Sequence, residues 1–139
     1  MAGLATHLSA GLLGAIIIHF LFYKSKPKLK LWYGLAFIIA NILPDLVDFG
    51  VLAIKTWNFN PSEIMKNPLF DTLAVFGHTF SNWSIMALVI LAIFLFLYEI
   101  EKIEKKTLIM VITFIALILL GIFIHLRLDI LIIEGSYWI

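Results

Sequence analysis

The stretch from Thr107 to Ile133, TLIMVITFIALILLGIFIHLRLDILII, contains no lysine, arginine or acidic residue before Arg127. A run of roughly 20 apolar residues is long enough to cross the hydrocarbon core of a bilayer as an α-helix. Three similar runs lie at about 4–23, 31–54 and 74–98. Because lipid offers no partner for open backbone groups, each run is expected to be helical.

The composition supports this interpretation. Of the 139 residues, 63% are hydrophobic and the mean hydropathy is +1.06, whereas soluble domains are roughly 45–50% apolar. We therefore predict an all-α fold, a polytopic membrane helical bundle of about four transmembrane helices that forms one domain over residues 1–139. The chain has no cysteine, so disulfides and thiolate metal sites are excluded. A net charge of +1 gives no indication of nucleic acid as a partner.

The lysines predict the orientation in the membrane. They concentrate in the first link, 24–30, and the third link, 99–106, and only Lys55 and Lys66 fall in the middle link. Cytoplasmic loops carry the excess of Lys and Arg, so the first and third links are expected inside and both termini outside. The N-terminus has no positive residue before its apolar run, so we expect a retained helix rather than a cleaved signal. The expected location is the cell or inner membrane.

Ionisable residues interrupt the apolar runs at positions that this orientation brings to one layer, near the extracytoplasmic edge of the hydrocarbon core. They occur early on the odd helices and late on the even ones. The six residues are His7, Asp45, Asp48, His78, His125 and Asp129. A charged residue at mid-membrane costs about 2.5–3.5 kcal/mol on insertion scales, so three aspartates need a cation or pairing partners.

Three histidines and three carboxylates form a ligand set that suits Zn²⁺ and also Mn²⁺ or Fe²⁺. We expect one or two ions, with zinc first, because six ligands exceed the needs of one tetrahedral ion. A single intramembrane His or Asp is more often a structural hydrogen-bonding group, and pairing of Arg127 with Asp129 or Asp45 is the main alternative. Arg127 could equally bind a substrate phosphate.

Neighbouring polar residues have weaker assignments. Asn41 and Asn82 lie one helical turn from Asp45 and His78, so we expect them to support the ligands by hydrogen bonding. Asp71 is a weaker ligand candidate in a loop. His19 lies near the predicted cytoplasmic end and about 120° around its helix from His7, so we interpret it as structural.

The set of short motifs resembles the YdjM-like membrane-bound metal-dependent hydrolases, whose ligand pattern is similar to that of zinc-dependent phospholipase C. The matching pieces span nearly the whole chain in family order: Thr6-His7, Leu43-Pro44-Asp45 with Asp48, His78-Thr79, and His125 with Asp129. Two features depart from the family pattern: the second aspartate comes one residue later than in many members, and no basic residue precedes His78. The resemblance implies a metal-dependent hydrolase, with Thr79 beside the central histidine.

The expected function is hydrolysis of a membrane lipid ester, in first place a phosphoester, at the outer-leaflet boundary. Asp45 or Asp48 would act as general base or bridge two metals, and Arg127 would hold the phosphate. A bound metal would lower the pKa of water towards about 7. Two alternatives remain: a non-catalytic ion-binding or transport protein, and a structural partner subunit. The sequence also leaves a homo-oligomer open.

Overall fold

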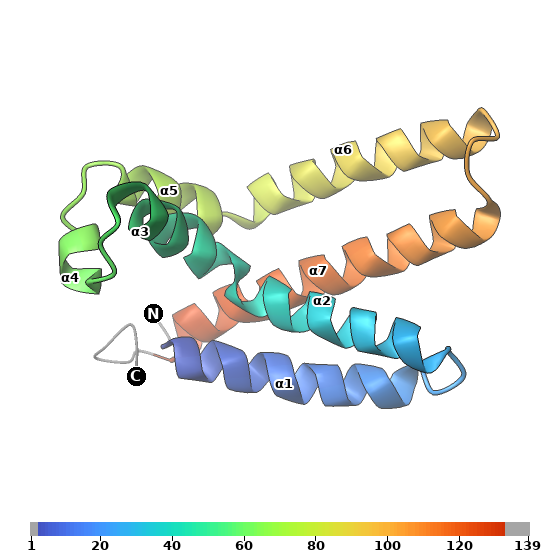
Figure 1. The fold of residues 1–139 in the computed structure, drawn as a ribbon, viewed down its shortest axis with the longest axis horizontal. Coiled ribbons are helices and arrows are strands. Elements are labelled where there is room, and N and C mark those ends of the chain that lie inside the picture. The colour runs from blue at the N-terminus through green and yellow to red at the C-terminus, as the bar shows by residue number, and fades with distance from the viewer. Residues whose placement is uncertain (1–2, 133–139) are drawn as a thin grey trace.

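The computed structural model describes residues 3–132, which contain helices and no strand (Figure 1). The elements are α1 (Leu4–Leu21), α2 (Pro27–Asp45), a π-helical turn (Leu46–Gly50), α3 (Val51–Thr56), α4 (Pro61–Ile64), α5 (Phe70–Gly77), α6 (Phe80–Glu99) and α7 (Lys105–Leu131). The π-helical turn joins α2 and α3 into one continuous helical segment.

Four of these segments are long and apolar enough to cross a membrane: Leu4–Leu21, Pro27–Thr56, Phe80–Glu99 and Lys105–Leu131. The prediction of an all-α chain with four candidate spans is therefore confirmed. The second span starts earlier than expected, because Pro27 occupies the first helical position, where its missing N–H costs nothing. The predicted end of the fourth run, residue 133, lies outside the described residues.

The third predicted run, 74–98, is wrong in one respect, since the structure breaks it into α5 and α6 at His78 and Thr79. Thr79 has an extended backbone, with φ −104° and ψ 107°. The last carbonyls of α5 would be left without partners, and side chains from beyond the break supply them. Thr79 donates to the carbonyl of Val75, and Asn82 and Trp83 donate to the next two carbonyls, at 3.1 Å and 2.6 Å.

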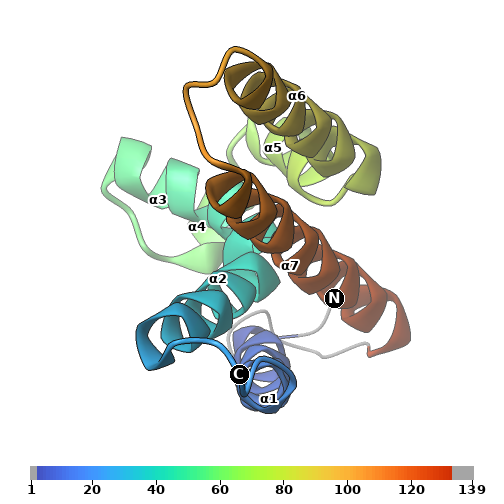
Figure 2. The same ribbon diagram turned by 90° about the vertical axis from the view of Figure 1, so that its right-hand side faces the viewer.

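The helices pack around α2 and α7. Helix α2 contacts both α1 and α7, whereas α6 contacts mainly α7 (Figure 2). Small residues let the backbones approach closely, which is the usual basis of helix pairing in lipid. An added Cβ on Gly121 of α7 would lie 2.7 Å from the Cβ of Ala40 and 3.1 Å from the carbonyl oxygen of Phe37 on α2.

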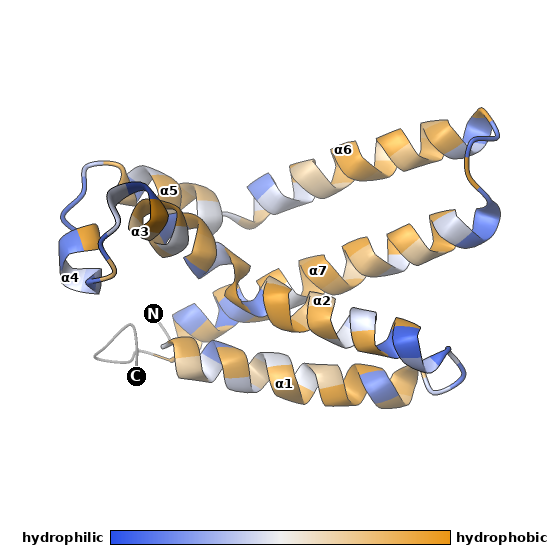
Figure 3. Ribbon diagram, in the orientation of Figure 1, coloured by the Kyte–Doolittle hydropathy of each residue, from blue (hydrophilic) through white to orange (hydrophobic). Residues whose placement is uncertain are grey.

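The two ends of the bundle are more polar than its middle. The links between α1 and α2 and between α6 and α7 lie together at one end, and the start of α1, the segment from α3 to α5 and the end of α7 lie at the other (Figure 1). Hydrophilic residues gather at both ends, and the middle of each long helix is apolar (Figure 3). Residues early on α1, late on α2, around the α5–α6 break and late on α7 therefore share one end.

We expect Gly121→Ala to destabilise the fold, because Ala40 belongs to a helix backbone that cannot move away cheaply. The expected loss is about 1–3 kcal/mol, the usual cost of overpacking, seen as a lower melting temperature in detergent. Gly50→Ala is the matched control, because its new Cβ would meet only Leu46, at 3.5 Å. Both positions are helical, so equal melting temperatures in the two variants would contradict the argument.

Candidate metal centre

Five ionisable side chains meet at the end of the bundle that holds the start of α1. His7 comes from α1, Asp45 from the end of α2, His78 from the α5–α6 break, and His125 and Asp129 from α7. Their accessibility is graded. His7 and His125 have side chains that are 0% exposed, whereas the exposed fractions are 9% for Asp129, 14% for His78 and 23% for Asp45. The cluster is thus closed on the α1 side and accessible on the Asp45 side.

Two imidazole rings face each other at the centre of this cluster. The Nε2 atoms of His78 and His125 lie 3.4 Å apart. One carboxylate oxygen of Asp129 lies 3.2 Å from the first and 3.3 Å from the second. Asp45 approaches the two Nε2 atoms from the end of α2. Its Oδ1 lies 3.6 Å from His78 Nε2 and 3.5 Å from His125 Nε2.

Hydrogen bonds on the far side of each ring determine its tautomer. His125 Nδ1 lies 2.7 Å from the carbonyl oxygen of Asn41, and a carbonyl can only accept, so Nδ1 carries the proton and donates. His78 Nδ1 lies 3.2 Å from the Ala74 carbonyl oxygen and 3.6 Å from Asp48 Oδ2, which are also acceptors. In the neutral rings both Nε2 atoms therefore present lone pairs to each other and to the carboxylates.

Such a convergence of lone pairs and carboxylates is unfavourable unless one ring is protonated or a metal ion lies among them. Five of the six separations among four of these atoms fit one ion. Bonds of about 2.0–2.1 Å in a tetrahedral zinc site place the ligand atoms about 3.3–3.4 Å apart. The five distances among His78 Nε2, His125 Nε2, Asp45 Oδ1 and Asp129 Oδ2 given above run from 3.2 to 3.6 Å. These side chains could hold a metal ion.

His7 joins the cluster through Asp129. Its Nε2 lies 3.2 Å from Asp129 Oδ1, the oxygen opposite the one that approaches His78 and His125. Its ring stacks on that of His125, with centroids 3.7 Å apart and planes 22° apart. His7, His125 and Asp129 thus form a second group of ligand atoms within 4.8 Å of one another. His7 could orient the Asp129 carboxylate or bind a second ion that this carboxylate bridges.

Asp48 lies behind His78 rather than beside the facing Nε2 atoms. Its side chain is fully buried in the π-helical turn, where Oδ1 accepts the backbone N–H of Phe49 at 2.7 Å. Its Oδ2 approaches the Nδ1 side of His78, as noted above. A carboxylate on the far nitrogen of a metal-binding histidine fixes the ring and raises its basicity. The structure thus places Asp45 of α2 and Asp48 of the π-helical turn on opposite sides of the His78 imidazole.

The predicted supporting residues divide into two kinds. Asn41 acts through its backbone carbonyl on His125, and its fully buried side-chain amide makes no hydrogen bond within the described residues. Thr79 and Asn82 cap the end of α5 and so hold the backbone that carries His78. The sequence interpretation missed Trp83, whose indole N–H caps Gly77. In the sequence, only its position five residues after His78 pointed to a role for Trp83 near that histidine.

Three other candidates lie away from the cluster. Arg127 is exposed and stacks over the ring of Phe123, 5.1 Å from its centroid. It is two residues from both His125 and Asp129, hence roughly 200° around the helix from each. Asp71 is exposed on α5, and His19 is exposed near the opposite end of α1. The structure does not bring any of the three to the facing histidines.

The charge of the cluster favours positive charge at His78, which lies between α5 and the candidate membrane span α6. Burial lowers its pKa, but the carboxylates of Asp129 and Asp45 outweigh burial and raise the pKa of His78 to about 10. In the metal-free chain a proton on His78 meets this preference for positive charge, and a bound metal ion would replace that proton.

The chain matches no family model, no curated protein and no solved structure. Its fold and site define a class in physical terms: a helical chain with four candidate membrane spans and a partly buried histidine–aspartate cluster at one end. The resemblance to the YdjM-like family stays an expectation that depends on the motifs alone.

We expect detergent-purified protein to retain at least about one transition metal ion per chain, and His78→Ala and His125→Ala to lose most of it. Each removes a central nitrogen ligand. Asp48→Asn should weaken metal affinity by about 10–100-fold, the usual effect of removing a partner behind a ligand. Elemental analysis and metal titration would measure both.

His19→Ala is the control, since it removes a histidine at the other end of the chain and should keep the metal. Full metal content in a chain carrying both His125→Ala and Asp129→Ala would show that these residues are not the ligands.

Proposed function

We propose that this chain is an integral membrane metal-dependent hydrolase that acts on a lipid ester, in first place a phosphoester. The observation that carries the proposal is the graded exposure of the cluster. A structural metal site is closed on all sides, whereas a catalytic one keeps a position open for water or substrate. Here His7 and His125 are fully buried and Asp45 is partly exposed, which leaves one accessible side.

The roles follow from position. His78, His125 and Asp129 form a two-histidine, one-carboxylate set of the kind that binds catalytic zinc, and Mn²⁺ or Fe²⁺ are the other candidates. A bound metal would activate water and polarise the scissile ester. Asp45 lies on the accessible side, where it could accept a proton from the attacking water or complete the ligand set. Asp48 would orient His78 rather than act as the base.

A lipid is the proposed substrate because of the depth of the cluster. The ligands lie on or beside the ends of apolar membrane-spanning helices, a position that a soluble substrate does not require. Lifting lipid tails into water would cost about 0.8 kcal/mol per exposed CH₂, and a site at the depth of the ester avoids this cost. The resemblance of the sequence motifs to the YdjM-like metal-dependent hydrolases agrees with this proposal.

The two alternatives receive less support from the described residues. Ion transport needs a polar path towards the end that carries His19, but a buried apolar cluster of Ile18, Tyr33, Phe37 and Leu117 occupies that part of the interior. A purely structural role through ion pairing needs Arg127 at the aspartates, and Arg127 lies instead against Phe123.

At confirmed metal occupancy, Asp45→Asn should lower the turnover of a lipid phosphoester by about 10²–10⁴-fold, the range for loss of a general base, because the amide keeps an oxygen for the metal but cannot accept the proton. The assay uses metal-loaded protein in vesicles of mixed labelled phospholipids, with products identified by mass spectrometry. Thr113→Val, on the middle of α7, is the control and should leave turnover unchanged. An absence of metal-dependent cleavage across a broad lipid panel, at confirmed metal occupancy, would refute the proposed activity.

The proposed orientation places the cluster on the extracytoplasmic side. It predicts that a cysteine at Ser62, exposed on α4, reacts with a membrane-impermeant thiol reagent in intact cells. A cysteine at Ser25, in the link between α1 and α2, should react only after permeabilisation. The reverse pattern would place the cluster on the cytoplasmic side.

A further inference from the structure

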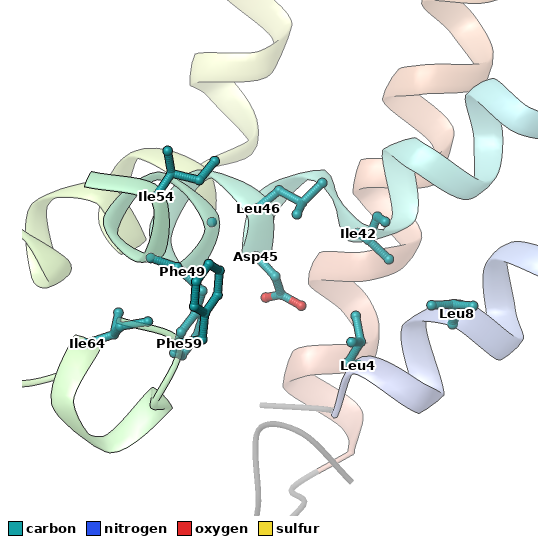
Figure 4. Close-up of a pocket in the computed structure, with 11 residues that line it drawn as sticks. Leu4, Leu8, Ile42, Asp45, Leu46, Phe49, Ile54, Phe59 and Ile64 are labelled. Carbon is teal, nitrogen blue, oxygen red and sulfur yellow. The ribbon is translucent and has the colours of Figure 1, made fainter. Parts of the chain in front are cut away.

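An apolar pocket of about 360 Å³ lies next to the metal-ligand cluster (Figure 4). Leu8 of α1, Phe49 of the π-helical turn and Ile64 of α4 are among its lining residues. Among the described residues, Asp45 is the only lining residue with a polar side chain. The pocket is therefore suited to a hydrocarbon with one polar end.

Asp45 belongs to both the pocket and the cluster. Its carboxylate lies between the rings of Phe49 and Phe59 on one side and Leu4 on the other (Figure 4). Its Oδ1 is also within 3.6 Å of the Nε2 atoms of His78 and His125. A ligand whose chain fills the pocket would thus place its head group at the accessible side of the cluster.

The rim of the pocket is apolar and exposed. The exposed fractions are 47% for Leu46, 68% for Ile54 and 69% for Phe59. Leu46 and Ile54 belong to the second candidate membrane span, so lipid is the medium that would meet this rim. A chain could then enter sideways without crossing water.

We propose that this pocket holds one alkyl chain of the lipid whose ester is cleaved at the cluster, an inference that depends on the proposed function. The volume lies near the lower limit of ordinary ligand pockets, roughly 300–1,000 Å³, which suits one chain rather than two. A chain that leaves the bilayer for an apolar pocket gains little hydrophobic free energy. The pocket therefore contributes by orienting the lipid, because a chain held in it fixes the ester beside Asp45.

Photolabelling tests the pocket independently of catalysis. The probe is a long-chain alkyl phosphate with a diazirine near the end of its chain, in phosphatidylcholine vesicles that contain the metal-loaded full chain. We expect labelled peptides to come from residues 46–64. Gly50→Leu should lower that labelling by roughly tenfold or more, because the new side chain fills the pocket.

Gly50 is a suitable position because its backbone is helical, with φ −64°, and an added Cβ meets only Leu46 at ordinary contact distance. The control is Met86→Phe, which places a larger side chain at a separate apolar cavity of about 210 Å³ that contains no cluster residue. It should leave labelling in 46–64 unchanged. Unaltered thermal stability of both variants would show that they are folded.

The outcomes separate this inference from the proposed function. Labelling spread over the exposed faces of α6 and α7, with no effect of Gly50→Leu, would overturn the chain pocket even if the protein hydrolyses lipids. Labelling confined to 46–64 and lost in Gly50→Leu would support the pocket even if no hydrolysis is found, in which case the proposed function alone would fail.

Discussion

The hydrogen bond from His125 Nδ1 to the backbone carbonyl of Asn41, 2.7 Å long, is the constraint on which the site depends. It joins α7 to α2 and leaves the Nε2 lone pair of His125 directed at His78. A carbonyl oxygen has two lone pairs, so Asn41 can accept from an imidazole without giving up its place in the helix. If this bond were absent, the ring could adopt the other tautomer and donate to Asp129, and the cluster would then need no cation.

The same bond forms only if α2 and α7 are close. Gly121 permits this approach one helical turn before His125, against Ala40, the residue before Asn41. In lipid, helix association depends on such close packing rather than on burial of apolar surface. The spacing of the metal ligands is therefore set by small side chains that have no chemistry of their own.

Much of the fold and part of the site could be predicted from the sequence. The apolar runs determined the spans, and the alternation of helix direction brought His7, Asp45, His125 and Asp129 to one end. The side of His78 that meets each aspartate could not be predicted, because His78 follows the last turn of α5, where helical periodicity no longer applies. The direction of the Asp48 side chain could not be predicted either, because Asp48 lies in the π-helical turn, where α-helical periodicity does not hold. By contrast, the position of Arg127 follows from spacing alone, since an i,i+2 relation to His125 and Asp129 places it on the opposite face of α7.

A cation in this cluster would also stabilise the fold. Helix α6 contacts mainly α7, and the α5–α6 break is held by three side-chain bonds to α5 carbonyls. At that break, the Nε2 atom of His78 lies close to Asp45 of α2 and to His125 and Asp129 of α7. An ion bound by these atoms would connect the α5–α6 break, which has few contacts with α2, to the closely packed pair of α2 and α7. Metal affinity and folding free energy are then coupled, so the residues that would perform the chemistry would also fix the geometry in which it occurs.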